Sequence, residues 1–359
     1  MGAFCFGQHY NQTNLVSNVS GVAPATDPDL INPWGMSRSS GSPWWVSDMG
    51  KGVSTLYSGA GAKKALTVTI PAALPHNQGT PTGTIFNGSK TDFLLAPGAP
   101  AIFLFCTIDG TIAGWNPAST TAVTAVKTRK GSSYTGLTSA YMDGERYLYA
   151  ANFGKGRVDV YDNAFHRVKL EDDRFEDERL PRDYVPFNVQ TIGNDIVVTY
   201  VLHEEGQPFE TDGPGLGYVD VFTSRGELLL RLEHGDWLNA PWGVALAPLD
   251  FGRFSHDLLI GQFSGGGNTE SSGYIAAYDL ITGKFEGLLE DTNGKPLAIN
   301  GLWSLSPGNA SPNNYDVVGP PAVAAAAELY FTAGPNHGTG GLLGFLKAVP
   351  TELIQGNNQ

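Results

Sequence analysis

His337 is the side chain whose surroundings most strongly suggest chemistry. It lies in the segment Gly334-Pro-Asn-His-Gly338, where it has no evident packing role. An imidazole titrates near neutral pH, so it is suited to moving a proton. Asp48 is a second polar candidate, in another of the loops that are expected to share the face of His337. Asp48 precedes a glycine-containing turn, so a turn-forming role is the alternative for it.

Aromatic side chains are predicted to surround these two groups. Pro-Trp-Gly occurs at 33–35 and 241–243, and looser forms occur at 186–188 and 302–304. Aromatic faces suit an apolar small molecule. For the recurring tryptophans the alternative is packing between repeats. The predicted substrate-binding residues are Trp34, Phe187, Asn188, Trp242, Phe263 and Trp303.

Several other kinds of catalytic chemistry are not indicated. The sequence contains no Gly-x-Ser-x-Gly, no His-Glu-x-x-His and no phosphate-binding loop. The histidines do not show the spacing of a zinc site. We therefore predict neither a metal nor a cofactor. A calcium ion held by Asp48, Asp109 and Asn188 is an alternative that their spacing does not require.

A repeated strand motif supplies the elements that must position these residues. The motif is Gly, any residue, an apolar residue, two more residues and an aromatic residue, as in Gly156-Arg-Val-Asp-Val-Tyr161. Its closing aromatic residues are Tyr57, Trp115, Tyr161, Phe222, Tyr278 and Phe345. Each copy follows a run of strand-forming residues, is followed by another short strand, and has one more strand before that run. Repeats with several strands each are typical of a β-propeller.

The sequence therefore predicts an all-β, six-bladed β-propeller of four-stranded antiparallel blades, forming one domain over residues 1–359. The sixth unit stops before its fourth strand, so we expect the N-terminal strand at 9–20 to close the ring. The predicted blades are 30–71, 79–128, 132–171, 183–233, 237–290, and 296–348 with 9–20.

In a propeller, the loops leading into the innermost strands share one face with the loops joining the second and third strands. Ligands usually bind in the depression between these loops. The predicted site residues fall in these two sets of loops. The long segments 202–216 and 262–272 are predicted to form its rim or a lid.

Composition limits the partners and the location. The net charge is −13, which argues against nucleic acid and anionic membranes. No apolar run is long enough for a transmembrane segment. Asn-x-Ser/Thr triplets begin at Asn11, Asn18, Asn87 and Asn309, which favours a glycoprotein. We expect a protein of the secretory pathway or the exterior whose signal peptide is not part of this chain, with the cytoplasm as the alternative.

Several segments resemble a largely uncharacterised propeller family found in bacteria, often as exported proteins, and in fungi. They include Thr13-Asn-Leu-Val-Ser17, Asn239-Ala-Pro-Trp-Gly243 and Leu329-Tyr-Phe-Thr-Ala-Gly-Pro-Asn336. The resemblance covers nearly the whole chain and is specific for fold, not for activity. In architecture and size the chain is also similar to the fungal six-bladed hetero-Diels–Alderases of tropolonic sesquiterpenoid biosynthesis.

That second resemblance implies a cofactor-independent enzyme of secondary metabolism. Such an enzyme dehydrates a benzylic alcohol to an o-quinone methide and guides its addition to a sesquiterpene alkene, so its partner is a small aromatic or terpene substrate. Proximity would supply much of the catalysis, and the resemblance implies an acid/base pair, for which Asp48 and His337 are the candidates. The alternatives are a metal-dependent, lactonase-type hydrolase and a non-catalytic, exported binding propeller.

Overall fold

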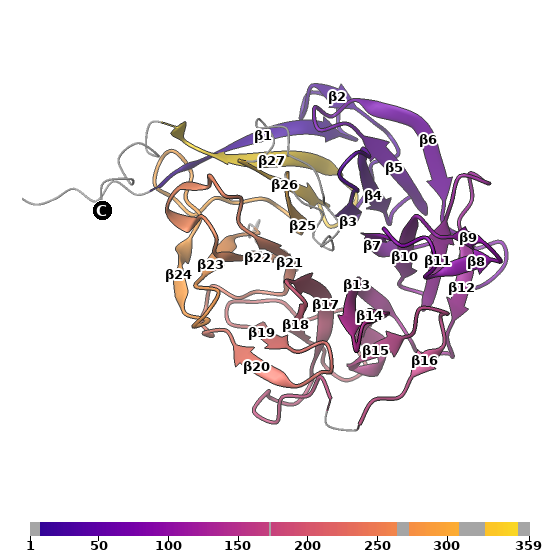
Figure 1. Cartoon of the computed structure of the whole chain (residues 1–359). Helices are drawn as coiled ribbons and strands as arrows, with labels where there is room; N and C mark the ends of the chain where they lie inside the picture. The colour runs from indigo at the N-terminus through magenta and orange to yellow at the C-terminus, as the bar shows by residue number, and fades with distance from the viewer. Residues whose placement is uncertain (1–7, 172–173, 264–272, 309–326, 351–359) are drawn as a thin grey trace, which may run out of the picture.

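The computed structural model describes residues 8–171, 174–263, 273–308 and 327–350. Over these ranges the chain is an all-β, six-bladed propeller, as predicted, with the blades arranged around a central axis (Figure 1). The helical elements with defined bounds are two single 3-10 turns, η1 (Phe153–Lys155) and η2 (Gly252–Phe254). The described residues include no helix with the length and hydropathy of a membrane span.

The first three blades each contain four antiparallel strands. Blade one consists of β3 (Pro33–Ser37), β4 (Trp44–Asp48), β5 (Val53–Tyr57) and β6 (Lys63–Thr69). Blade two consists of β7 (Pro81–Phe86), β10 (Phe103–Thr107), β11 (Thr111–Trp115) and β12 (Val123–Lys127), with the small hairpin β8 (Leu94–Ala96) and β9 (Ala99–Pro100) inserted. Blade three consists of β13 (Tyr134–Met142), β14 (Glu145–Asn152), β15 (Arg157–Tyr161) and β16 (Arg167–Val168).

The last three blades follow the same order from the axis outward. Blade four consists of β17 (Tyr184–Ile192), β18 (Asp195–Leu202), β19 (Tyr218–Phe222) and β20 (Leu228–Arg231). Blade five consists of β21 (Pro241–Leu246), β22 (Leu258–Gln262), β23 (Ile275–Tyr278) and β24 (Phe285–Leu288). Blade six consists of β25 (Leu302–Pro307), β26 (Glu328–Ala333), β27 (Leu342–Ala348), β1 (Tyr10–Ser17) and β2 (Ala25–Thr26).

Blade six joins the two ends of the chain. β1 runs antiparallel to β27, with Tyr10 opposite Ala348 and Ser17 opposite Leu342. Figure 1 shows these two strands side by side. β2 pairs in parallel with the outer side of β1. The N-terminal strand thus provides the fourth strand of the sixth blade and closes the ring, as predicted.

Glycines allow the innermost strands to approach one another closely. A Cβ on Gly35 of β3 would lie 2.6 Å from the carbonyl oxygen of Thr82 in β7. A Cβ on Gly83 of β7 would lie 2.5 Å from the amide nitrogen of Leu137 in β13. Neither distance is compatible with a side chain, so the glycine of Pro33-Trp-Gly35 is needed for contact between blades.

The aromatic residues that close the repeated motif form the core between the blades. Tyr57, Trp115, Tyr161, Phe222 and Tyr278 are buried, and Phe345 is half-buried. Between blades one and two, the ring of Trp45 stacks on Phe103 at 4.1 Å and packs against Trp115 at 4.7 Å. The motif therefore marks strands whose aromatic side chains hold neighbouring blades together.

Asn87 has a structural role that conflicts with glycosylation. It is 3% exposed, and its amide donates hydrogen bonds to the carbonyls of Asp92 and Ala101. Its Oδ1 accepts a hydrogen bond from Arg146. This predicted acceptor is therefore inaccessible in the folded chain. Asn309 and most of the predicted rim segment 262–272 lie outside the described residues.

Candidate functional site

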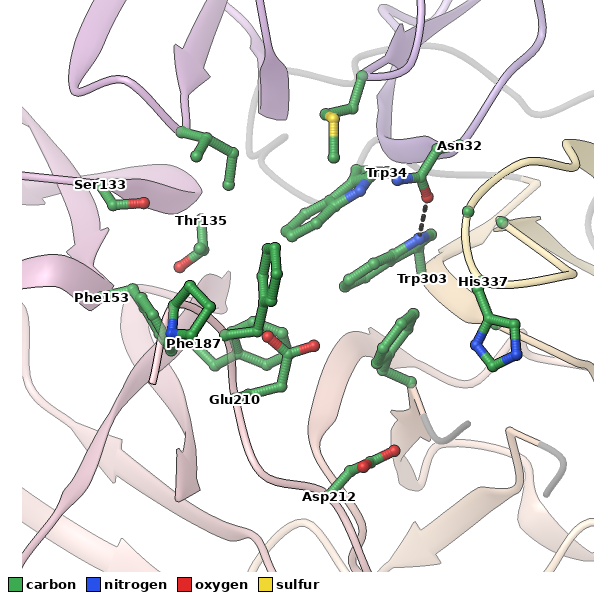
Figure 2. A pocket seen from close by; sticks show the side chains of 18 of the residues that line it. Asn32, Trp34, Ser133, Thr135, Phe153, Phe187, Glu210, Asp212, Trp303 and His337 are labelled. Carbon is green, nitrogen blue, oxygen red and sulfur yellow. Dashed lines mark hydrogen bonds between the residues drawn. The ribbon is translucent and has the colours of Figure 1, made fainter. Parts of the chain in front are cut away.

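A cavity of about 580 Å³ opens at the mouth of the propeller. All six blades contribute to its lining (Figure 2). Most of the lining is apolar, and the described lining residues include two carboxylates, one imidazole and no lysine or arginine. The lining residues are Asn32, Trp34, Met49, Ile108, Ser133, Thr135, Phe153, Phe187, Pro208, Phe209, Glu210, Asp212, Phe263, Asn300, Gly301, Trp303, Gly334, His337 and Gly338.

Stacked aromatic rings form one wall of the cavity. Trp303 lies at the start of β25, between the rings of Trp34 and Phe263. Its ring centroid is 3.6 Å from that of Trp34 and 4.0 Å from that of Phe263. Its indole Nε1–H donates a hydrogen bond of 2.9 Å to Oδ1 of Asn32 (Figure 2). Phe187 packs against Trp34 and Trp303 with centroids 6.2 and 6.0 Å away. This wall presents a closely packed group of apolar rings to a ligand.

Backbone geometry fixes the Asn32 side chain that holds Trp303. Asn32 has φ 46°, a left-handed conformation that asparagine tolerates better than most residues. A Cβ on Gly334 would lie 2.2 Å from Asn32 Oδ1, and one on Gly338 would lie 2.8 Å from its Nδ2. The two glycines of the His337 loop therefore leave the space that Asn32 fills.

His337 lines the cavity from blade six, as predicted. It and Asn336 both have φ 56°, and Gly338 has φ 74°, so three successive residues are left-handed. The amide of Asn336 donates a hydrogen bond of 3.2 Å to Oδ1 of Asn300, which also lines the cavity. This loop geometry places the imidazole at the cavity edge (Figure 2).

Glu210 provides a carboxyl group inside the cavity. It is half-buried in the segment between β18 and β19, and Figure 2 shows its side chain reaching in beside Phe187. Burial raises the pKa of Glu210, and the charge of Asp212 raises it further, although His203 opposes this. A carboxyl group in such surroundings keeps its proton at higher pH than an exposed one, so it can act as an acid.

Five of the predicted site residues line the cavity: Trp34, Phe187, Phe263, Trp303 and His337. Asn188 and Trp242 do not line the cavity, but Trp242 packs against the lining residues Trp34 and Trp303, and Asn188 holds the backbone of Trp242. Asn188 Nδ2 donates to the carbonyl of Trp242 at 2.7 Å, and Trp242 Nε1 donates to the carbonyl of Thr135 at 3.0 Å. The edge of Trp242 packs against Trp34 and Trp303 at 6.0 and 5.7 Å.

Asp48 lies outside the cavity lining. It is fully buried at the end of β4, and its Oδ2 accepts hydrogen bonds from the amide and hydroxyl of Thr55 at 3.0 and 2.7 Å. Burial raises the pKa of Asp48 well above its ordinary value. The structure therefore does not bring Asp48 and His337 together in the cavity, and the carboxyl groups that do line it are Glu210 and Asp212.

Each residue of the alternative calcium set makes hydrogen bonds to a different part of the protein, Asp48 to Thr55 and Asn188 to Trp242. Asp109 accepts hydrogen bonds from the Thr107 hydroxyl and the Ala73 amide, which ties two loops together. Among the residues that the structure describes, no group of three or more His, Cys, Asp or Glu is placed to hold a metal ion.

Sequence reasoning missed Pro208, Phe209, Glu210 and Asp212, which line the cavity from one segment of blade four. The available signal was the length of 202–216, which predicted a rim at this place without singling out a residue. Met49 and Ile108 were also missed, because each directly follows a residue, Asp48 or Thr107, that was considered for its polarity.

Comparisons with known proteins place the chain among poorly characterised relatives. No family model matches it. Uncharacterized protein L690 of Acanthamoeba polyphaga mimivirus is 30% identical over 347 residues, covering 92% of this chain and 84% of the viral protein. Uncharacterized protein R648 of the same virus is 28% identical over 342 residues, covering 92% and 78%.

Two solved structures share the fold. A structural genomics protein of unknown function from Bacteroides thetaiotaomicron VPI-5482 has a TM-score of 0.54 at 13% identity, covering 96% of this chain and 77% of its own. The soluble aldose sugar dehydrogenase from Escherichia coli has a TM-score of 0.53 at 12% identity, covering 95% and 99%. These proteins give no support to the predicted identity as a fungal hetero-Diels–Alderase. At 30% identity over most of both sequences, the chain belongs to the family of the first mimivirus protein.

Proposed function

We propose that this protein is an enzyme that binds a flat, largely apolar small molecule in the mouth cavity and transfers a proton with Glu210. The observation that carries the proposal is one carboxyl group, with its pKa raised by burial, inside an aromatic cavity. The volume of about 580 Å³ is within the range of small-molecule sites. Enzymes often raise the pKa of a carboxyl group in this way when it serves as a general acid.

The specific reaction that we propose is the dehydration of a hydroxybenzyl alcohol. Protonated Glu210 gives its proton to the benzylic hydroxyl, the C–O bond breaks, and water leaves. The phenolic hydroxyl loses its proton to His337, and the neutral product is an o-quinone methide. Positive charge develops at the benzylic carbon as water leaves, and the electron-rich ring of Trp34 favours such charge.

The apolar wall supports the second half of this proposal, the addition of the o-quinone methide to a terpene alkene. This addition needs little further acid/base chemistry, because holding two reactants in contact supplies much of the rate. Phe263 and Phe187 offer apolar ring surface for the alkene, and Trp303 is stacked on Phe263. The dehydration leaves no charge on the reacting atoms of the ring and the benzylic carbon, which fits an apolar lining.

Isotope exchange tests the dehydration without knowledge of the natural alkene. The ortho isomer of hydroxybenzyl alcohol is incubated with the protein in water that carries a heavy isotope of oxygen, and incorporation of this oxygen into the benzylic hydroxyl, which requires cleavage of the C–O bond, is followed by mass spectrometry. Reversible dehydration by wild type predicts exchange above background. Glu210→Gln keeps the shape of the side chain and is expected to abolish exchange, whereas Glu205→Gln, an exposed change in the same loop, is expected to leave it intact.

If the alcohol binds to wild type and no label is incorporated, the proposed chemistry is wrong. Binding is measured separately by quenching of tryptophan fluorescence, since Trp34 and Trp303 line the cavity.

A further inference from the structure

Three exposed cationic residues belong to two segments that pack against each other beside the cavity. Arg129 and Lys130 belong to the segment between β12 and β13, and Lys155 is the last residue of η1. A Cβ on Gly131 would lie 2.7 Å from Lys155 Nζ, so this ammonium group rests against the backbone that follows Lys130. All three cations are exposed. We call Arg129, Lys130 and Lys155 the cationic rim.

The cationic rim adjoins the cavity wall in both segments. Ser133 lies three residues after Lys130, and Phe153 lies two residues before Lys155; both line the cavity. Figure 2 shows Ser133 and Phe153 on the same side of the cavity. A ligand that extends out of the cavity past Ser133 and Phe153 would therefore run toward the two segments that carry the cations.

Hydrogen bonds hold the two segments in a fixed relation. The buried Asn152 accepts a hydrogen bond of 3.2 Å from the amide of Ser133 at Oδ1. Its Nδ2 donates to the hydroxyl of Ser132 at 3.2 Å. A Cβ on Gly154 would lie 2.5 Å from the carbonyl of Gly131, so the backbones pack directly on each other. The cations thus extend from a rigid base.

The cationic rim has no anionic partner within the described part of the chain. Two nearby arginines differ from these three cations because each is paired with a carboxylate. Arg157 and Arg167 both bind Oδ1 of Asp159, at 2.8 and 2.6 Å. Grouped cations repel one another, and an anion that binds between them relieves this repulsion. Such a group on a protein with a net charge of −13 is a local exception to the overall charge.

The carboxylates of the lining come from another edge. Glu210 and Asp212 belong to the segment between β18 and β19, and Figure 2 shows Asp212 away from Ser133. An anionic substituent is therefore favoured at one edge of the mouth and disfavoured at the other. This asymmetry gives an anionic ligand a single preferred orientation.

We propose that the natural ligand is an organic anion, with its apolar ring system in the aromatic cavity and its anionic group bound by Arg129, Lys130 and Lys155. This inference rests on the proposed function, because it assigns a substrate class to the same cavity. The anionic group is a carboxylate, a sulfonate, a phosphate or an acidic enol. Each of these accepts charge-assisted hydrogen bonds from lysine and arginine.

Two fluorescent probes that differ by one charged group test the proposal. Anilinonaphthalene sulfonate is anionic, and N-phenylnaphthylamine has the same rings without the sulfonate. Wild type is expected to bind the anionic probe more tightly, and each probe is expected to displace the other. The advantage of the sulfonate should shrink as salt rises from about 50 mM to about 500 mM, because exposed charges are screened.

The triple variant Arg129→Gln, Lys130→Gln, Lys155→Gln is expected to lower affinity for the anionic probe by roughly tenfold, since exposed ion pairs contribute about twofold to fivefold each. Its affinity for the neutral probe should not change. The matched control replaces three exposed lysines elsewhere, Lys64, Lys90 and Lys284, with Gln and should change neither affinity.

Equal affinity of wild type for the two probes, or an unchanged ratio in the triple variant, overturns the anion proposal. If the cavity is not the binding site at all, the result is different, because Trp303→Ala would then leave the affinity for the neutral probe unchanged. Failure of the proposed chemistry is different again, since isotope exchange would be missing while the anionic preference persisted.

Discussion

Two aspartates at the same position of the repeated strand motif are expected to respond in opposite ways to loss of their charge. Asp159 is the fourth residue of the motif in β15, and Asp220 is the fourth residue in β19. Both are buried, at 3% and 0% exposure. Their surroundings differ because the second residue of the motif is Arg157 in one strand and Tyr218 in the other.

Asp159 is stabilised as a carboxylate. Tyr134 and Asn152 donate hydrogen bonds to its Oδ2 at 2.9 and 2.6 Å, and Arg157 and Arg167 donate to its Oδ1. Burial alone would raise the pKa of Asp159, but the bonds from Arg157, Asn152 and Tyr134 outweigh it and lower the pKa. Breaking a buried ion pair costs about 3–5 kcal/mol. Because both arginines are half-exposed and can turn to solvent, we expect Asp159→Asn to cost roughly 1–3 kcal/mol.

Asp220 is destabilised as a carboxylate. Arg231 Nε is 3.6 Å from its Oδ1, beyond hydrogen-bonding distance, and this arginine also binds Asp177. Burial therefore raises the pKa of Asp220 from 3.8 to about 7. Such a rise corresponds to roughly 4 kcal/mol for ionising the folded state. Since Arg231 offsets part of this, we expect Asp220→Asn to stabilise the protein by roughly 2–4 kcal/mol at about pH 8.

The two effects have different pH dependences. The raised pKa of Asp220 means that its contribution to wild-type stability falls as pH rises from about 4 to about 7, because Asp220 ionises first in the unfolded chain. The gain from Asp220→Asn should therefore grow between about pH 5 and about pH 8. The lowered pKa of Asp159 means that its stabilisation is complete above about pH 4 and is lost only at lower pH. The cost of Asp159→Asn should be the same at both values.

Urea unfolding, followed by circular dichroism at about pH 5 and about pH 8, measures the free energy of unfolding of the wild type and of both variants. The reasoning is refuted if Asp220→Asn destabilises the protein at about pH 8, or if its effect does not change with pH. Either result would mean that Arg231 forms a working ion pair with Asp220.

Three further changes test the site and its frame. Glu210→Gln should lower the isotope-exchange rate at least about 100-fold; wild-type exchange should decline as pH rises through the raised pKa of Glu210, and a pH-independent wild-type rate contradicts this role. Trp303→Phe removes the hydrogen bond to Asn32 and part of the aromatic wall, so a titration should show about fivefold weaker binding of the neutral probe; unchanged affinity contradicts the cavity assignment. Gly136→Ala places a Cβ 2.8 Å from the Cα of Asn188 in β17, so it should cost roughly 1–3 kcal/mol in thermal unfolding. Gly41→Ala, with open space around it, should cost far less. Equal effects of the two changes contradict the close packing of the inner strands.

The fold was predictable because its signals repeat. A glycine before a strand and an aromatic residue five positions later recur six times, and burial of Tyr57, Trp115 and Tyr161 explains why this pattern must persist. Closure by the N-terminal strand followed from counting strands, since the sixth unit lacked one. These inferences needed only the local sequence pattern of each repeat and the number of strands in each unit.

The site was less predictable because it depends on parts that do not repeat. Glu210 lies in a long segment whose sequence is not repeated in the other blades, so no pattern marked it. Asp48 was attractive as a polar residue at the end of a strand, yet its side chain turns to Thr55 and away from the mouth. His337 was identifiable because glycine and proline around it left no packing role.

The pairing of β1 with β27 also determines how the ring responds to force. Tyr10 faces Ala348, so the two ends of the chain leave the pair at the same side. Pulling on Tyr10 and Ala348 in opposite directions therefore breaks the hydrogen bonds between β1 and β27 one at a time, starting at this end of the pair. It does not load all of these bonds at once, as a shear force along the strands would. The ring should open first at this seam and at low force, while the other five blades, each made from one continuous segment, remain folded.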